Sequence, residues 1–333
     1  MSQCKLLLTG FADEASESKL VAEQFSVMAA LGLKYLSLRF IDAGNGIKNA
    51  MDLNEDEIGV VQRELKRFDL EVSSLGSPIG KVKLFDFDDG TSNQFFEADD
   101  YLENHIHKAC RLAKSFGTKL IRGFSFYHPR GEKPQQYVQD AANRLAAICK
   151  ICDEHGLTFG LEVEANLVGQ NAETLTQIHQ TVDSDSLVLI FDGANLVTQG
   201  YSTGEIVQQF KQMLPALGWI HIKDYASDNA GERQDYVDEE ALNRFVPAGS
   251  GDSDYLAILK LLAENYSTIK SRLDARGIVG LFADLEPHLR KGGQFGGFSG
   301  PDGFGVAARA FVELCENANV LCELATIKEM GDR

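Results

Sequence analysis

Positive charge is scarce in this sequence: 32 Lys and Arg residues face 49 Asp and Glu residues, which gives a formal net charge of −17 over 333 residues. A field of this sign repels phosphate backbones and anionic lipids, so we expect no nucleic-acid partner and no membrane partner. Long apolar runs are also lacking, because residues 187–191 form one of the longest and a membrane helix needs about 20. The short apolar run after Lys5 is too brief for a signal peptide, so we expect a cytoplasmic protein.

The six cysteines are scattered and form no compact framework, which fits reduced thiols in a cytosol. Cys149 and Cys152 match a C-x-x-C pattern, but they lie in a stretch of helical periodicity where positions i and i+3 share a face. We therefore expect both to face the core rather than to carry redox or metal chemistry.

Short apolar runs of strand type alternate with longer stretches of helical periodicity. Strands are expected at residues 5–10, 34–39, 71–75, 119–124, 158–163, 187–191, 219–223 and 278–285. Helices are expected at residues 16–31, 55–68, 101–116, 135–155, 172–182, 204–213, 254–265 and 305–319.

Strict alternation predicts a parallel sheet with right-handed crossovers, and eight such units predict closure into a single (β/α)8 TIM barrel. The competing doubly wound sheet usually has a glycine-rich nucleotide turn after its first strand, and residues 10–14 (GFADE) do not form one. No linker rich in Pro, Ser or Gly divides the chain, so we expect one domain over residues 1–333. Two long segments, 224–251 and 290–303, are expected at the C-terminal face, where such barrels build their sites.

Four ionisable residues stand where an apolar strand ends: Glu162, Asp192, His221 and Glu286. A barrel brings these strand ends to one mouth, so the four side chains should converge. Three carboxylates and one imidazole are costly to bring together unless a cation neutralises them. Each alone would indicate a salt-bridged strand end, but four together favour one divalent metal ion. The ligand set suits Mn²⁺, Mg²⁺, Co²⁺ or Zn²⁺, of which we favour Mn²⁺.

Four segments of the sequence resemble the strand motifs of the xylose isomerase-like TIM barrels, the sugar phosphate isomerase and epimerase family. They are residues 156–162 (GLTFGLE), 191–195 (FDGAN), 220–224 (IHIKD) and 285–288 (LEPH), and the similarity spans nearly the whole chain. The resemblance implies that Glu162, Asp192, His221 and Glu286 bind one divalent metal. It is weak for substrate, because the same barrel hosts several activities.

The resemblance also implies that Glu162 and Glu286 are the catalytic carboxylates and face opposite sides of the substrate carbon. One carboxylate would remove a proton next to a carbonyl, leaving a metal-stabilised enediolate. The implied activity is a divalent-metal-dependent isomerase or epimerase of a small sugar or sugar phosphate. A homodimer or homotetramer is suggested by the same resemblance.

Two residues depart from the family pattern. Asn195 stands where many relatives have a histidine, which makes an expected substrate contact neutral. Glu164 stands two residues after Glu162 where a histidine is common, and it is an alternative ligand, a third acid/base group or a substrate contact. These changes keep open an alternative activity, a metal-dependent lyase or dehydratase of a keto-polyol that resembles inosose dehydratase.

Four further residues near strand ends are candidate substrate contacts. Lys223 and Asp224 follow the histidine ligand, and Arg122 and His128 flank the end of the fourth strand. A solvated rim pair for the first two, or a structural role for the last two, is an equally good interpretation.

Three other residues have less certain roles. Arg39 closes the second strand and would face substrate or neutralise the acidic mouth. Lys81 lies on a loop, where lysines are usually solvated, and His288 would orient Glu286. The glycine-rich residues 291–303 predict a lid whose phenylalanines pack over the mouth, with an anion site as the alternative.

Two other classes of protein fit the sequence less well. A nuclease of the endonuclease IV type uses several metals with many histidine ligands, whereas this chain has only seven histidines and a net charge of −17. A non-catalytic scaffold would bind no metal, and the complete set of four candidate ligands argues against it.

Overall fold

The computed structural model describes residues 3–88, 90–228, 231–292 and 297–325. Eight parallel strands make up the barrel wall: β1 (Lys5–Gly10), β2 (Tyr35–Leu38), β5 (Glu71–Gly76), β6 (Leu120–Gly123), β7 (Thr158–Glu162), β8 (Leu187–Asp192), β9 (Leu217–Ile222) and β12 (Leu281–Leu285). Their order in the sheet is β1-β12-β9-β8-β7-β6-β5-β2. The barrel closes between the first and last strands of this order, β1 and β2, through one parallel bridge between Phe11 and Ser37.

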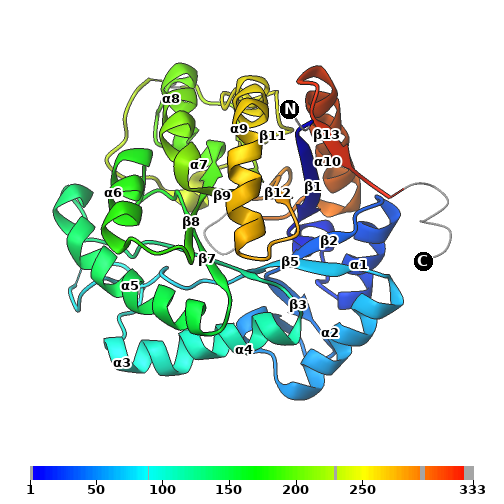
Figure 1. Cartoon of the computed structure of the whole chain (residues 1–333), viewed down its shortest axis with the longest axis horizontal. Helices are drawn as coiled ribbons and strands as arrows, with labels where there is room; N and C mark the ends of the chain where they lie inside the picture. Colours follow the sequence, from blue (N-terminus) through cyan, green and yellow to red (C-terminus); the bar gives the residue numbers. More distant parts are fainter. Residues whose placement is uncertain (1–2, 89, 229–230, 293–296, 326–333) are drawn as a thin grey trace.

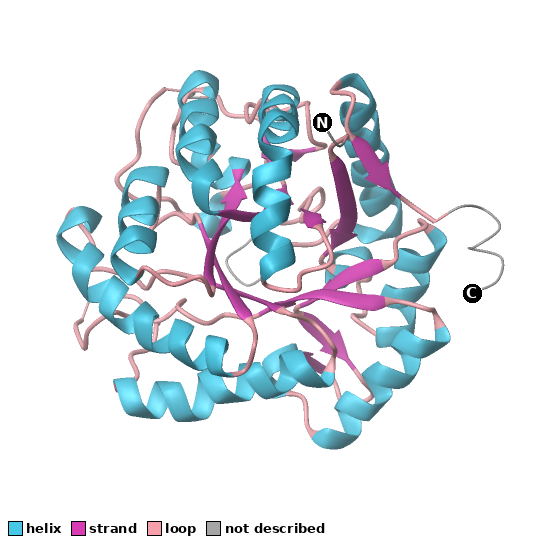
Figure 2. Ribbon diagram, viewed as in Figure 1, coloured by secondary structure: helices cyan, strands magenta, loops and turns pink. Residues whose placement is uncertain are grey.

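Helices surround this curled sheet on its outside (Figure 1, Figure 2). The longer ones are α1 (Val21–Ala30), α2 (Glu55–Arg67), α4 (His107–Ser115), α5 (Val138–Glu154), α6 (Ala172–Val182), α8 (Thr203–Met213), α9 (Tyr255–Ala275) and α10 (Gly300–Asn317). Short helices α3 (Ala98–Tyr101) and α7 (Gly193–Val197) lie in connections. This arrangement confirms the predicted (β/α)8 TIM barrel.

Local sequence explains where these elements begin. Asn54 caps α2 by accepting a hydrogen bond from the Glu57 backbone N–H, while the Glu57 carboxylate accepts one from the Asn54 backbone N–H. Val61 and Leu65 then place one apolar face of α2 against the core. β8 reads LVLIFD and is buried at every position, as expected of a parallel strand covered on both faces.

The structure differs from the sequence-based expectation mainly at element ends. α9 continues beyond the predicted residue 265 to Ala275, because Tyr266, Ile269 and Leu273 extend its buried face at helical spacing. α10 begins at Gly300 rather than 305, with Pro301 in its first turn, where proline needs no hydrogen-bond partner.

Five short strands were not predicted, because runs of two or three residues have no measurable periodicity. β13 (Leu321–Glu323) pairs with β1, while β3 (Phe40–Asp42) with β4 (Ile47–Asn49) and β10 (Asp224–Tyr225) with β11 (Phe245–Val246) form small antiparallel pairs. Residues 293–296 of the predicted lid lie outside the described residues.

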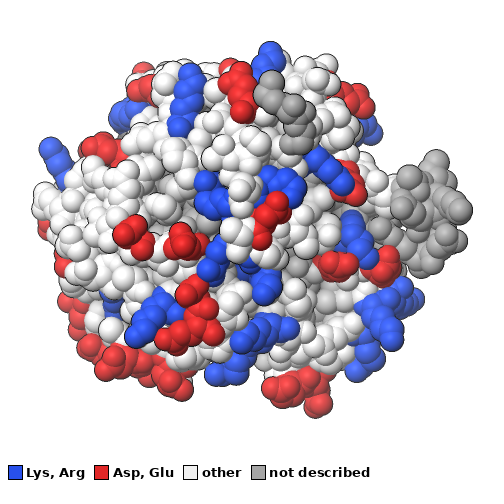
Figure 3. Space-filling model, viewed as in Figure 1, with Lys and Arg blue, Asp and Glu red and all other residues white. Residues whose placement is uncertain are grey.

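The surface charges, the helices and the cysteine side chains can be compared with what the composition predicted. Figure 3 shows acidic and basic side chains mixed over one face of the molecule rather than gathered in a field of one sign. In the described part of the chain, no helix has the length and apolar content needed to cross a membrane. Cys149 and Cys152 are buried on α5, as predicted.

Glycine at position 160 lets the barrel interior close around Trp219, the single tryptophan of the chain. A Cβ atom placed on Gly160 would lie 2.0 Å from the Trp219 ring, which is fully buried. Neither partner has free space to move into, because interiors are close-packed.

Gly160→Ala should therefore destabilise the fold by about 1–3 kcal/mol through overpacking. Gly59→Ala is the matched control, since a Cβ there meets only the Arg63 side chain at 3.5 Å. The control should be neutral or stabilising by up to about 1 kcal/mol, because alanine is the better helix former. Urea unfolding measures both, and equal stability of the two variants would contradict the packing argument.

Candidate active site

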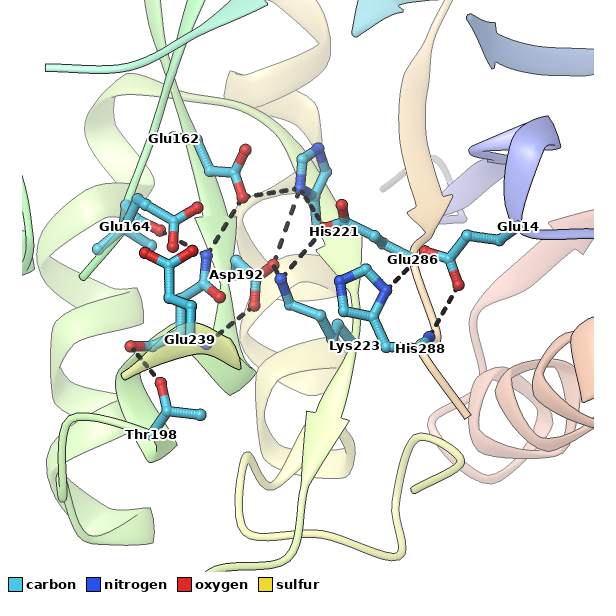
Figure 4. Close-up of polar contacts among 12 residues, drawn as sticks. Glu14, Glu162, Glu164, Asp192, Thr198, His221, Lys223, Glu239, Glu286 and His288 are labelled. Carbon is cyan, nitrogen blue, oxygen red and sulfur yellow. Dashed lines mark hydrogen bonds and ion pairs between the residues drawn. The ribbon is translucent and has the colours of Figure 1, made fainter. Parts of the chain in front are cut away.

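The four strand-end residues converge at the C-terminal mouth of the barrel (Figure 4). Glu162 ends β7, Asp192 ends β8, His221 is the penultimate residue of β9, and Glu286 follows β12. The Nδ1 atom of His221 lies 3.3 Å from Glu162 Oε1, 3.6 Å from Glu286 Oε2 and 3.8 Å from Asp192 Oδ2. One ligand atom from each residue lies within 4.8 Å of all the others, and all four residues are buried.

Unsatisfied polar atoms mark this group as a place for a cation. His221 Nδ1 and Asp192 Oδ2 are buried and make no hydrogen bond, although Oδ2 has an ionic contact with Lys223 Nζ at 3.0 Å. Leaving such an atom without a partner costs about 1–3 kcal/mol, so buried polar atoms are normally paired. Three carboxylates with one imidazole form a donor set that suits Mn²⁺, Mg²⁺, Co²⁺ or Zn²⁺. The residues present therefore fit a single divalent ion.

Glu286 is held between two permanent cations. Arg39 Nη1 donates to Glu286 Oε1 at 2.5 Å, and Lys223 Nζ donates to Oε2 at 3.2 Å. Burial alone would raise the pKa of Glu286, but Lys223 and Arg39 outweigh burial and hold this pKa well below its usual range. Arg39 thus neutralises the acidic mouth, which is one of its two predicted roles.

Glu162 has a different set of partners. Arg122 Nη1 donates to Glu162 Oε2 at 3.1 Å, and the Asn195 amide donates to Oε1 at 3.2 Å. Burial would raise the pKa of Glu162, but His221 and Arg122 outweigh it and lower this pKa to about 2. Glu162 therefore stays anionic near neutral pH.

Asp192 both caps a helix and belongs to the group of candidate metal ligands. Its Oδ1 atom accepts a hydrogen bond from the Asn195 backbone N–H and so caps α7, while its Oδ2 atom lies 3.0 Å from Lys223 Nζ. Burial raises the pKa of Asp192 to about 6, although Lys223 opposes the rise. A second positive charge beside Oδ2 would therefore stabilise the anion strongly.

Glu164 lies outside the ligand group and pairs with Lys81 across the pocket wall. Lys81 Nζ is 3.3 Å from Glu164 Oε2 and 3.7 Å from Glu239 Oε2. Burial raises the pKa of Glu164 to about 8, with Lys81 opposing and Glu239 adding to the rise. The expectation of a solvated Lys81 is wrong, because its side chain is only 9% exposed and is held by these two carboxylates.

Two of the predicted substrate contacts lie elsewhere. Asp224 is buried and accepts hydrogen bonds from the backbone N–H groups of Gly249, Gly251 and Ser253, at 2.9–3.1 Å. It anchors the base of the long loop and does not line the pocket. His128 lines a neighbouring pocket rather than the one above the ligand group.

The other predicted contacts surround a pocket that we call the inner pocket, whose accessible volume is about 60 Å³. Four cationic side chains line it, Arg39, Lys81, Arg122 and Lys223, together with three carboxylates, Glu164, Glu239 and Glu286. Further lining residues that bear on the argument are Asn195, Phe245 and His288.

The sequence reasoning missed a buried pair at the edge of this pocket. His288 Nδ1 lies 2.7 Å from Glu14 Oε1, and the His288 backbone N–H and Ser299 hydroxyl both donate to Glu14 Oε2. His288 is therefore oriented by Glu14, and ligand atoms of Glu14, His288 and Glu286 lie within 4.8 Å of one another. Glu14 belongs to a short 3-10 turn (Ala12–Ala15) after β1 (Lys5–Gly10), so the rule that selected residues at strand ends does not find it.

Comparisons with named proteins give distant relatives. An inosose dehydratase from Clostridium perfringens is 23% identical over 220 residues, which cover 63% of this chain and 70% of that protein. A 3-dehydroshikimate dehydratase from Bacillus anthracis is 26% identical over 116 residues, which cover 35% of this chain and 40% of that protein.

Solved structures show the same fold at lower identity. The IOLI protein with a binding zinc atom superposes with a TM-score of 0.64 and 14% identity, covering 94% of this chain and 99% of that one. The 3-keto-D-glucoside 4-epimerase YcjR from E. coli superposes with a TM-score of 0.56 and 14% identity, covering 94% and 100%. At such identities the likeness shows a shared fold only.

Family membership rests on a broader match. The family model described as a xylose isomerase-like TIM barrel matches residues 25–275, which is most of the 333-residue chain. The matched region contains strands β2 to β9 and three of the four convergent residues, Glu162, Asp192 and His221. The chain therefore belongs to the xylose isomerase-like TIM barrel family.

Proposed function

We propose that this protein is a divalent-metal-dependent dehydratase of a small keto-polyol. It removes a proton next to a carbonyl and expels the β-hydroxyl as water. The observation that carries the proposal is that Glu162 and Glu286 are both held by cations and stay anionic, while Glu164, the carboxyl whose pKa is raised, lies outside the metal-ligand group. Both relatives compared by sequence are named dehydratases, which supports the same reaction class.

The four convergent residues, Glu162, Asp192, His221 and Glu286, would hold the metal ion. A divalent ion bound there would polarise the substrate carbonyl and neutralise the charge that develops when the α-proton leaves. Of these four residues Glu286 lines the inner pocket, as do Arg122, Asn195 and Lys223, which contact Glu162 or Asp192.

Proton removal falls to the carboxylates that stay anionic. Arg122 and Asn195 fix Glu162, and Arg39 and Lys223 fix Glu286, so each oxygen has a set direction. With these partners neither carboxylate is suited to hold a proton for return to the opposite face of the substrate. Because neither of the two carboxylates can return a proton, elimination is favoured over two-base epimerisation.

The departing hydroxyl needs a proton from a different group. Glu164 lies on the other side of the ligand group from the Glu14–His288 pair (Figure 4), and with Lys81 it forms a proton-donating pair in the pocket wall. The α C–H electron pair forms the new double bond, the β C–O bond breaks, and the transferred proton completes water. The product is an unsaturated ketone, and no oxidant or reductant is consumed.

Isomerase or epimerase activity is the second candidate. Glu162 and Glu286 approach His221 Nδ1 from different strands, β7 and β12, at 3.3 and 3.6 Å. Two carboxylates on either side of one centre are what epimerisation requires, because one face loses a proton and the other gains it.

Metal binding tests the basis of both candidates. The purified protein reconstituted with Mn²⁺ should hold one ion per chain, and Glu286→Gln should lose it because a ligand charge is removed. Glu313→Gln, on the exposed face of α10, is the matched control and should keep the ion. Elemental analysis after dialysis gives the count, and a wild-type protein without stoichiometric metal would contradict the proposal.

Product analysis separates the two candidates. In D₂O with Mn²⁺ and a panel of ketoses and keto-polyols, a dehydratase yields a product lighter by one water with a new conjugated-ketone absorbance. An epimerase instead yields a stereoisomer labelled at the α-carbon. Glu162→Gln should lower turnover by about 10² or more, as expected for loss of a general base, while Glu313→Gln should not. Solvent deuterium in a stereoisomer without water loss would establish the second candidate instead.

A further inference from the structure

A second pocket opens beside the inner pocket. This outer pocket encloses about 920 Å³, measured out to open solvent. It is built by four connections on the C-terminal face, and its lining residues are Thr91, Ser92, Asn93, Tyr127, His128, Arg130, Gly131, Asn166, Asp235, Tyr236, Asp238, Glu239 and Glu240. None of the roles assigned to the inner pocket requires this space.

The two pockets share one wall. Glu239 lines both of them, and along residues 236–239 the chain alternates, with Val237 facing the inner pocket and Tyr236 and Asp238 the outer one. The Asn166 side chain fixes this wall by donating to the Val237 carbonyl at 2.9 Å and accepting from its N–H at 3.0 Å. A ligand that extends past Glu239 therefore enters a formed pocket.

His128 offers an unused hydrogen-bond acceptor in the outer pocket. Its Nδ1 atom lies 3.0 Å from the Pro129 carbonyl oxygen, which can only accept, so Nδ1 carries the proton. Burial lowers the pKa of His128, although the Pro129 contact opposes this, so the ring is neutral at neutral pH. Its Nε2 atom is closed off from solvent and has no hydrogen-bond partner among the described residues. A ligand hydroxyl in the outer pocket would satisfy this atom after the His128 side chain turns toward the pocket.

Charge distinguishes the outer pocket from the inner one. The outer pocket has four carboxylates, at positions 235, 238, 239 and 240, against the single cation Arg130, whereas the inner pocket has four cations against three carboxylates. The Arg130 guanidinium lies 3.8 Å over the Tyr236 ring and forms a flat platform with it. This lining repels phosphate, while its carboxylate and amide oxygens can accept hydrogen bonds from neighbouring hydroxyls.

We propose that the outer pocket binds a second, uncharged sugar ring, so that the substrate is a glycoside whose keto ring occupies the inner pocket. The inference rests on the proposed function for the position of the keto ring. His128 and the Arg130–Tyr236 platform then select for the second ring rather than take part in the reaction.

Calorimetric binding to the Mn²⁺-loaded full-length protein tests this without turnover. The probes are the ketose disaccharides lactulose, isomaltulose and turanose, compared with D-fructose. At least one disaccharide should bind about 10-fold or more tightly than fructose, as expected for one or two added hydrogen bonds. His128→Ala should remove most of this gain and leave fructose affinity unchanged.

Two variants keep the result interpretable. His155→Ala removes another imidazole with a buried, unpaired nitrogen, but at the far end of α5, and should leave disaccharide binding unchanged. Tyr236→Ala changes a side chain that is 40% exposed, so it should fold normally and also lose the disaccharide gain.

The outcomes separate this inference from the proposed function. Disaccharides that bind no more tightly than fructose, or variants that weaken both equally, would overturn the outer-pocket assignment even if the enzyme dehydrates a monosaccharide. A disaccharide gain that depends on His128 and Tyr236 would support it even if no water is lost from any substrate.

Discussion

Three carboxylates and one imidazole approach within 4.8 Å of one another in the interior of this protein, and such a group needs positive charge nearby. Arg39, Arg122 and Lys223 supply part of that charge, each by direct contact with one or two of the carboxylates. Two atoms of the group, His221 Nδ1 and Asp192 Oδ2, make no hydrogen bond, and a divalent ion would coordinate both of them. Much of the mouth is thus organised around charge compensation, not around apolar packing.

The same constraint separates the two pockets. Cations gather around the ligand group because its carboxylates require them, and they therefore line the inner pocket. Beyond Glu239 there are no ligand-group carboxylates to neutralise, and the lining of the outer pocket is acidic and rich in amide side chains. The strongly acidic composition of the chain conceals this contrast, because net charge averages over a surface where both signs are mixed.

The sequence was sufficient to predict the barrel and its central residues, for a definite physical reason. Strand and helix periodicities are local, and in a parallel barrel every strand ends at the same mouth, so Glu162, Asp192, His221 and Glu286 could be brought together without coordinates. The partners of long loops could not be inferred in this way. Lys81 is buried by its contacts with Glu164 and Glu239, and Asp224 by its contacts with residues 249–253, and the sequence contains no local signal for these contacts.

The anchoring of Asp224 has a consequence for how this protein could diversify. Asp224 lies three residues after His221 and ties together the two ends of the loop that walls both pockets. Because these hydrogen bonds hold the two ends of the loop together, a change in its length or composition should not shift the position of β9. New substrate ranges can therefore arise by insertion or exchange between two fixed points, while the residues that perform the chemistry stay in register.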